Sequence, residues 1–166
     1  MIELRKITEQ DTHNIVKWRN QKFVKRNLFT QTDLSAEQHN NWLKAYVQTG
    51  MCSQYIIVAY ENGVCKDIGT TFIKNIDGFS KKGEFGIFIG EKEYLGRGYG
   101  KIATKLMLDI AFSELNLHRV YLYVMSDNVA AIKAYESVGF VVEGVLRQDF
   151  FRDGSFIDIV MMGKVK

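Results

Sequence analysis

The strongest structural signal in the sequence is the glycine-rich stretch Tyr94-Leu95-Gly96-Arg97-Gly98-Tyr99-Gly100-Lys101. It follows an apolar run that is typical of a strand, and it opens the longest segment with helical spacing of apolar residues, Gly98 to Leu115. Three glycines separated by single residues allow a tight turn, in which several backbone N–H groups and the helix dipole point at one place. The stretch therefore favours binding of a phosphate or pyrophosphate.

This stretch has three other possible interpretations. A P-loop would need a glycine where Leu95 stands and a serine or threonine where Ile102 stands. The pattern Gly98-x-Gly100-x-x-Ala103 matches a dinucleotide fingerprint, but that motif normally opens a doubly wound sheet, and here a strand-rich segment precedes it. A plain strand-to-helix turn remains an alternative, although each glycine destabilises a helix start by about 1 kcal/mol relative to alanine.

A second motif lies downstream, where Asn128 to Phe140 reads NVAAIKAYESVGF. Together the two motifs resemble the GNAT superfamily of acyl-CoA-dependent N-acetyltransferases, whose cofactor loop is [QR]-x-x-G-x-[GA] and whose later motif is N-x-x-A-x-x-x-Y-x-x-x-G-F. The chain departs from the first pattern at Leu95, so the resemblance implies that backbone groups of the loop act without a side chain from that position. The resemblance extends over nearly the whole chain.

The order of predicted elements agrees with this family. Strands are expected at Ile2–Thr8, Gln54–Tyr60, Asp67–Asn75, Lys82–Gly90 and Arg119–Met125, with a hairpin of Val141–Phe151 and Phe156–Val165 at the end. Helices are expected at Glu9–Asn20, Ser35–Gln48, Gly98–Leu115 and Asn128–Ser137. The predicted fold is α+β (α/β) and GNAT-like, with a central mixed, mostly antiparallel sheet of six to seven strands flanked by about four helices, in a single domain spanning residues 1–166.

Composition and charge exclude several other classes of protein. The chain has 166 residues, 46% of them hydrophobic and 25% charged, and a net charge of +3, which is too small to indicate a nucleic-acid partner. No apolar run approaches the length of about 18 residues that a membrane helix needs, and the N-terminus does not resemble a signal peptide, so a soluble cytoplasmic protein is expected. Cys52 and Cys65 lack metal-ligand spacing and are expected to be reduced thiols, and no metal is predicted.

The resemblance implies that acetyl-CoA is the cofactor. Backbone amides of the glycine-rich loop would hold the pyrophosphate of coenzyme A, and backbone groups at the end of the preceding strand would pair with its pantetheine arm and polarise the thioester carbonyl. Asn128 would bond the same arm, and it is also a candidate helix N-cap. The implied cofactor-binding residues are Phe88, Ile89, Gly90, Arg97, Gly98, Tyr99, Gly100, Lys101 and Asn128.

Acetyl transfer to an amine needs a proton donor for the leaving thiolate and a base for the amine. Tyr135 is the candidate general acid, because the resemblance places its helix beside the thioester sulfur; a packed aromatic is the alternative. Glu84 is the candidate base, with a solvated strand-end acid as the alternative. Relatives that acetylate ribosomal proteins carry a base on the next strand, where this sequence has Tyr123. His39 or a water chain is a further candidate for the base.

The N-terminal part carries the information on the acceptor. Lys17 to Arg26 holds five cations and no acid, which suits an anionic small molecule. Trp18-Arg19-Asn20 and the segment Ser35 to Trp42 resemble GNAT enzymes that acetylate a nucleotide-linked amino sugar, as in pseudaminic acid synthesis. Arg19, His39 and Arg147 are the candidate substrate residues. The expected acceptor is thus a nucleotide-linked amino sugar; the alternatives are a polyamine, a protein N-terminus, or a non-catalytic acyl-CoA-binding module. A homodimer is also expected.

Overall fold

The computed structural model describes residues 1–166, and its centre is one seven-stranded sheet in the order β1-β2-β3-β4-β5-β7-β6. Every neighbouring pair is antiparallel except β4 and β5, which run parallel. The strands are β1 (Ile2–Lys6), β2 (Ser53–Glu61), β3 (Val64–Asp77), β4 (Lys82–Ile89), β5 (Arg119–Met125), β6 (Val141–Arg152) and β7 (Ser155–Val165). The mixed, mostly antiparallel sheet that the sequence predicted is confirmed.

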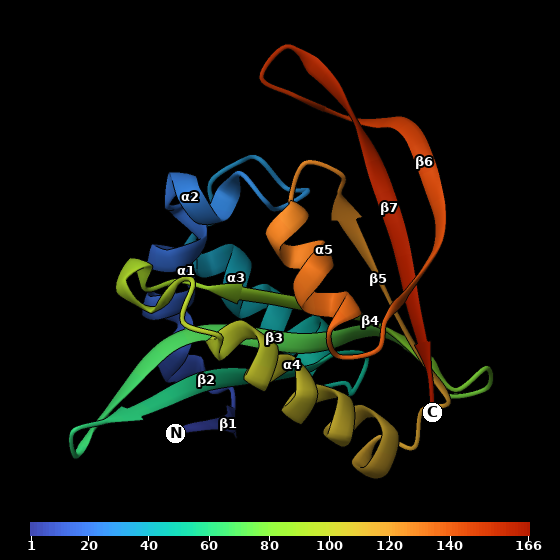
Figure 1. The fold of residues 1–166 in the computed structure, drawn as a ribbon. Coiled ribbons are helices and arrows are strands. Elements are labelled where there is room, and N and C mark those ends of the chain that lie inside the picture. Colours follow the sequence, from blue (N-terminus) through green and yellow to red (C-terminus); the bar gives the residue numbers. More distant parts are fainter.

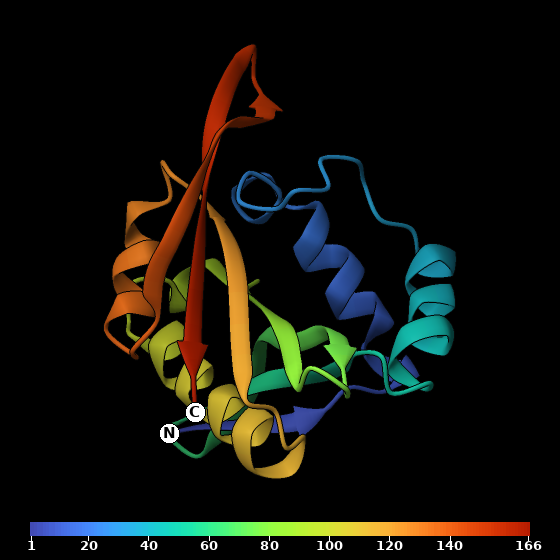
Figure 2. The ribbon, with the colours of Figure 1, turned by 90° about the vertical axis from the view of Figure 1, so that its right-hand side faces the viewer.

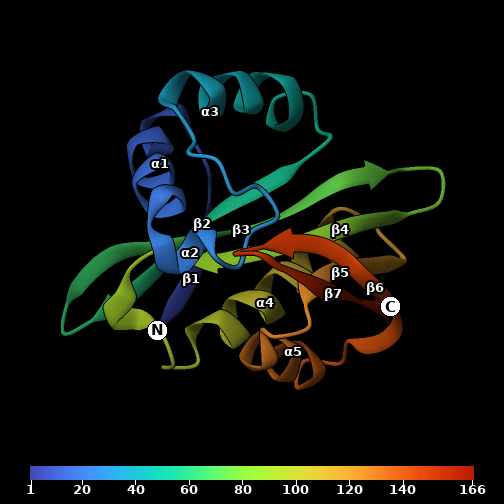
Figure 3. The same cartoon turned by 90° about the horizontal axis from the view of Figure 1, so that it is seen from above.

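Helices cover both faces of the sheet (Figure 3). One face carries α1 (Thr12–Asn20), the short α2 (Lys22–Lys25) and α3 (Ala36–Trp42), and the other carries α4 (Tyr99–Asp109) and α5 (Val129–Glu136). Wider turns at Leu43–Val47 and Ile110–Glu114 prolong α3 and α4. All four predicted helices are present, and α2 is an addition that the charged stretch Lys22 to Arg26 did not reveal.

Local sequence signals explain where several elements begin and end. The Ser35 hydroxyl accepts from the N–H of Gln38, whose side chain bonds back to the Ser35 N–H, so a capping box begins α3. Gly139, with φ at 94°, follows the end of α5 and lets the chain turn into β6. These signals are short-range, which is why the sequence located the elements within a few residues.

The core is divided by the sheet into two layers. The larger cluster lies under α4 and α5 and includes Phe85, Met107, Leu122, Phe140 and Met162. A smaller cluster of Ile7, Ile15, Trp18, Leu43, Ile56 and Val58 lies under α1 and α3. Because side chains alternate along a strand, β4 sends Phe85 to the first layer and places Phe88 against the second.

The parallel pair β4 and β5 separates soon after it forms. Only Lys82 to Glu84 of β4 pair with Arg119 to Tyr121 of β5, and beyond these residues the two strands diverge (Figure 1). At the far edge, the hairpin of β6 and β7 projects beyond the body of the sheet (Figure 2). The divergence leaves one edge of β4 without a strand partner from Phe85 onward, in the middle of the molecule.

No helix combines the length and the apolar character that crossing a bilayer requires.

Candidate active site

The glycine loop, residues Gly96 to Lys101, ends at the start of α4 and presents free donors. No hydrogen bond of the chain uses any of its six backbone N–H groups. Gly96 and Gly98 have φ values of 70° and 80°, a conformation that few residues other than glycine adopt without strain. Unused N–H groups at the start of a helix of eleven residues attract an anion, so the geometry fits the predicted pyrophosphate site.

The loop is attached to the neighbouring hairpin through its side chains. The Arg97 guanidinium lies 2.5 Å from Oε1 of Glu61, at the end of β2, and the Tyr99 hydroxyl donates to the same oxygen. The hydrogen bond from Tyr99 is the main reason why the pKa of Glu61 lies below its ordinary value, and the same bond raises the pKa of Tyr99. The side chain of Arg97 is therefore engaged within the protein, which leaves its backbone N–H for a ligand.

The free edge of β4 supplies the second set of unpaired backbone groups. Gly90 donates its N–H to the carbonyl of Ile68, across the strand pair, at 2.8 Å. Since the groups of an antiparallel strand point alternately to its two sides, Phe88 also faces β3, whereas Ile87 and Ile89 face the gap beside β5. The gap is thus lined by backbone groups of Ile87 and Ile89.

This register corrects part of the sequence-based expectation. Of the three residues expected to pair with pantetheine, only Ile89 directs its backbone into the gap. The carbonyl of Gly90 is also occupied, because it accepts from the side-chain amide of Gln21 at 2.9 Å. Ile87 was not among the expected residues, because the strand register that directs its backbone into the gap cannot be read from the sequence.

Gly90 has a packing role instead. A Cβ placed on it would lie 2.1 Å from Cγ of Trp18, far inside van der Waals contact. Trp18 is 1% exposed, and its indole N–H donates to Glu91 at 2.8 Å. Gly90 is therefore the residue that lets α1 lie against the end of β4.

Tyr135 lies on α5 and its ring is held by two aromatic neighbours. The ring centroids of Phe85 and Phe140 are each 5.9 Å from that of Tyr135, and both pairs are edge to face. The hydroxyl makes no protein hydrogen bond, and burial raises the pKa of Tyr135 to about 12. The phenol is therefore held in place, protonated at neutral pH and free to donate.

Asn128 caps the N-terminus of α5, as its alternative interpretation predicted. Its side-chain oxygen accepts from the N–H of Ala131 at 3.3 Å. The preceding residue, Asp127, pairs with Arg152 at the end of β6. Capping uses the oxygen of Asn128 and leaves its amide N–H groups for another partner, so the two predicted roles are compatible.

Glu84 stands where β4 and β5 separate, on the sheet face that carries α1 to α3. Its carboxylate lies 3.2 Å from Nζ of Lys74 and accepts from the side-chain amide of Asn75 at 2.8 Å. The side chain is 14% exposed, so it differs from the freely solvated strand-end acid that was the alternative. Both carboxylate oxygens already have a partner. To act as a base, Glu84 would therefore have to give up one of these contacts or accept the proton on an oxygen that keeps it.

His39 is fixed between α1 and α3. Thr12 donates its hydroxyl to Asn40 at 2.8 Å, so it accepts from Nδ1 of His39 at 2.9 Å. His39 is 3% exposed, and its Nε2 is a buried atom without a hydrogen-bond partner. Burial first, and the charge of Arg19 second, lower the pKa of His39. The imidazole is therefore neutral at pH 7, with an acceptor lone pair on Nε2.

Arg19, on α1, is half-buried and makes no ion pair or hydrogen bond, and burial lowers its pKa. Two other cations of the basic stretch are paired with acids: Lys17 lies 3.3 Å from Glu91, and Lys25 lies 2.5 Å from Asp33. Of the three candidate substrate residues, Arg19 and His39 lie on the same side of the sheet. Arg147 is exposed on β6, on the projecting hairpin.

Arg152 is a link between distant segments that the sequence did not indicate. It is buried, donates to the carbonyl of Arg26 at 2.9 Å and pairs with Asp127. Phe29 and Phe150 meet nearby, edge to face, at 5.6 Å. These contacts join the segment after α2 to the hairpin, and no local pattern could have indicated a pairing of residues so far apart in the sequence.

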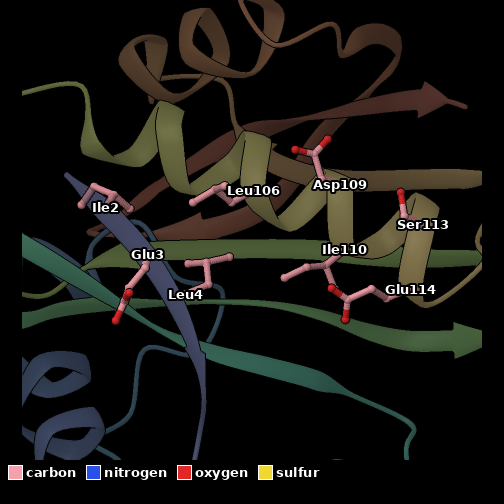
Figure 4. A pocket seen from close by; sticks show the side chains of 8 residues that line it. All are labelled: Ile2, Glu3, Leu4, Leu106, Asp109, Ile110, Ser113 and Glu114. Atoms are coloured by element: carbon pink, nitrogen blue, oxygen red, sulfur yellow. The ribbon is translucent and has the colours of Figure 1, made fainter.

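One cavity lies away from all of these groups. A hollow of about 380 Å³ between β1 and α4 contains none of the predicted site residues (Figure 4). Its lining consists of Ile2, Glu3, Leu4, Leu106, Asp109, Ile110, Ser113 and Glu114. The candidate active site consists instead of the gap between β4 and β5 and the glycine loop, where unpaired backbone groups lie.

The match to a known family model decides the classification. The model described as "Acetyltransferase (GNAT) domain" matches residues 2–141. The chain belongs to the GNAT acetyltransferase family. Among curated GNAT relatives, the spermidine N(1)-acetyltransferases of Vibrio cholerae and Escherichia coli K12 are each 37% identical, over 95 and 94 residues. These matches cover 57% of this chain and 54% and 50% of the relatives, so the chain spans about half the length of the curated relatives it matches.

Solved GNAT structures match over more of the chain. The crystal structure of spermidine N-acetyltransferase from Vibrio cholerae with CoA and spermine has a TM-score of 0.91 at 26% identity and covers 99% of this chain and 95% of that one. A dodecameric structure of the Vibrio cholerae enzyme has a TM-score of 0.83 at 25% identity, with 99% and 93% covered. These matches confirm the predicted GNAT-like fold.

Proposed function

We propose that the chain is an acetyl-CoA-dependent N-acetyltransferase that acts on the primary amine of a small molecule. The observation that supports this most is the gap between β4 and β5. Unpaired backbone groups of Ile87 and Ile89 line it, and the six free N–H groups of the glycine loop stand at the start of α4. An extended ligand with an amide-rich arm and a pyrophosphate end matches these two sets of donors and acceptors.

Acetyl-CoA, when bound, supplies an acetyl group as a thioester. Backbone N–H groups of the glycine loop would hold the pyrophosphate, and those of Ile87 and Ile89 would orient the pantetheine arm and bind the carbonyl oxygen as negative charge develops on it. The amine nitrogen forms a bond to the carbonyl carbon while the carbon–sulfur bond breaks. Tyr135 would give its proton to the departing sulfur, since its phenol is protonated and has no other partner.

A base has to take the proton that the amine loses. Glu84 is the proposed group, directly or through water, because it stands where β4 and β5 separate and is held on the acceptor side by Lys74 and Asn75. His39 is less suited, because its free nitrogen Nε2 is buried. The family resemblance matches Tyr123 to the position of the base in ribosomal-protein acetyltransferases, so we do not extend their mechanism to this chain.

The comparisons favour a polyamine acceptor over the nucleotide-linked amino sugar that the sequence led us to expect. Both curated relatives named above are spermidine acetyltransferases, and the structure of one of them contains spermine. Spermidine is therefore the first acceptor to test. The expected product is a singly acetylated polyamine with free coenzyme A.

One observation supports an anionic acceptor as a second candidate. Arg19 is half-buried and has no acidic partner, whereas the acids Glu84, Asp33 and Asp127 are each paired with a cation. A polycation binds best to unpaired carboxylates, and a phosphate binds best to an unpaired guanidinium. An amine on a sugar nucleotide fits this charge distribution.

A panel of amines distinguishes these candidates. The release of coenzyme A would be measured with acetyl-CoA and either spermidine, a nucleotide-linked amino sugar or a peptide N-terminus. Arg19→Ala should raise the KM of an anionic acceptor and leave that of spermidine unchanged or lower, with Lys22→Ala as a matched control at an exposed cation. Transfer to no amine, with acetyl-CoA bound, would favour the non-catalytic module.

We also infer that copies of the chain associate as a homodimer through β6. This strand has no neighbour on its outer edge, and Val141, Val145 and Leu146 are exposed on it. Unpaired edge strands with exposed apolar residues tend to pair with another chain. Light scattering should report twice the mass of one chain. Val145→Lys should reduce the measured mass to that of the monomer. Val64→Lys, on the β2–β3 hairpin, should leave the mass unchanged.

A further inference from the structure

The glycine loop is held from outside by a single carboxylate. Glu61, the last residue of β2, receives hydrogen bonds from both Arg97 and Tyr99 on the same oxygen, Oε1. The guanidinium of Arg97 also lies 5.3 Å from the ring centroid of Tyr94 and 5.1 Å from that of Tyr99. Arg97 is thus surrounded by two aromatic rings and one acid, all belonging to the protein.

Apart from these contacts, the loop is supported at its helical end, where the carbonyl of Gly98 accepts from the N–H of Ile102 and that of Gly100 accepts from the Thr104 hydroxyl. Its backbone N–H groups make no internal hydrogen bond, and no atom outside the neighbouring residues lies within 4 Å of where a Cβ would stand at Gly96, Gly98 or Gly100. Glycines are the residues with the largest conformational freedom to lose. Ordering the loop therefore costs conformational entropy. If no contact within the protein orders the loop beforehand, this cost lowers the affinity for the ligand.

We propose that Glu61 is a positioning residue for the cofactor: it fixes Arg97 and Tyr99, and so sets the glycine loop in its pyrophosphate-binding conformation before the ligand arrives. Glu61 itself touches no ligand in this proposal. Its negative charge is balanced by Arg97, so it does not oppose an anion on the loop. The inference rests on the proposed use of acetyl-CoA, because it concerns the loop that would hold the pyrophosphate.

The test compares ligands with and without a pyrophosphate. Binding of CoA and of pantetheine would be measured by calorimetry for the wild-type chain, Glu61→Ala and Glu61→Gln. Glu61→Ala should weaken CoA binding by about tenfold, the scale of one hydrogen bond to a charged group, and leave pantetheine binding unchanged. Glu61→Gln keeps an oxygen for Tyr99 and should give a smaller loss. In turnover, the KM for acetyl-CoA should rise while kcat and the acceptor KM stay constant.

A double-mutant cycle checks the route of the effect. If Glu61 acts in part through Tyr99, combining Glu61→Ala with Tyr99→Phe should weaken CoA binding by less than the product of the two single effects. Glu3→Gln is the matched control for Glu61→Gln, since Glu3 on β1 accepts from the Tyr60 hydroxyl in the same kind of exposed bond and makes no hydrogen bond to the loop. That variant should bind CoA like the wild type.

Two results would overturn the proposal. One is CoA binding by Glu61→Ala that is as tight as, or tighter than, that of the wild type, which would mean that Glu61 competes for Arg97. The other is an equal loss for CoA and pantetheine, or a drop in melting temperature that accounts for the loss, which would make Glu61 a general structural residue. A wild-type chain that binds neither ligand would instead refute the proposed function.

Discussion

The ring of Tyr135 on α5 packs edge-on against the ring of Phe85 on β4, with their centroids 5.9 Å apart. This contact fixes the phenol over the free half of β4 without using its hydroxyl. The ring and the hydroxyl therefore have separable roles, and a variant that removes only the oxygen can tell them apart.

Tyr135→Phe keeps the packing and loses the proton donor. We expect kcat to fall by about 10²-fold, the usual contribution of a general acid. The melting temperature and the affinity for CoA should be unchanged, because both aromatic contacts remain. Stopped-flow or steady-state assays with acetyl-CoA would measure the change; turnover equal to that of the wild type would assign Tyr135 to packing alone.

The raised pKa of Tyr135 predicts how kcat depends on pH in the alkaline range. Burial moves that pKa to about 12, so the phenol stays protonated up to pH 10 and should cause no loss of activity there. We expect kcat to rise or stay level between pH 7 and pH 10. An alkaline decline with a midpoint below 10 that is absent in Tyr135→Phe would contradict the raised value.

Gly90→Ala should destabilise the protein through overpacking against Trp18. The added methyl group would lie within 2.1 Å of the indole, so α1 or β4 has to move, at a cost of about 1 to 3 kcal/mol in the free energy of unfolding. Urea denaturation would measure it. Gly78→Ala is the control, because its Cβ would meet nothing within 4 Å; equal stability of both variants would show that α1 is not tightly seated.

His39 predicts a loss of stability in acid. Its pKa in the folded protein lies below 6.5, mainly because of burial, so as the pH falls the unfolded chain binds a proton at this residue before the folded chain does. The free energy of unfolding should therefore fall below about pH 6.5, by at most about 1.4 kcal/mol per pH unit. His39→Gln should flatten this dependence, whereas His13→Gln, at an exposed position, should retain it.

Arg152→Leu should affect the acceptor more than the cofactor. The change removes the hydrogen bond to the carbonyl of Arg26 and the ion pair with Asp127, so the segment after α2 loses its tie to the hairpin. We expect the KM of the acceptor to rise several-fold, with a smaller change in the KM for acetyl-CoA. Equal effects on both would indicate that the main role of Arg152 is to hold Asp127 beside Asn128.

The amino-acid sequence alone determined the order of strands and helices, the glycine loop and the motif that carries Asn128 and Tyr135. These features depend on residues close together in the chain: apolar spacing, caps such as Ser35, and glycines at turns. Such features can be predicted from a single sequence, because the few neighbouring residues that cause the local structure are also the residues that form the recognisable pattern.

The tertiary structure decided which groups meet. It directed the backbone of Ile89, and not that of Phe88 or Gly90, into the gap beside β5, because the register of β3 against β4 sets which side each N–H faces. It also brought Glu61 to Arg97, and Arg152 to the carbonyl of Arg26. Such pairings join residues that are far apart in the sequence and depend on how the strands and helices pack. The pattern of residues within one segment therefore cannot predict them.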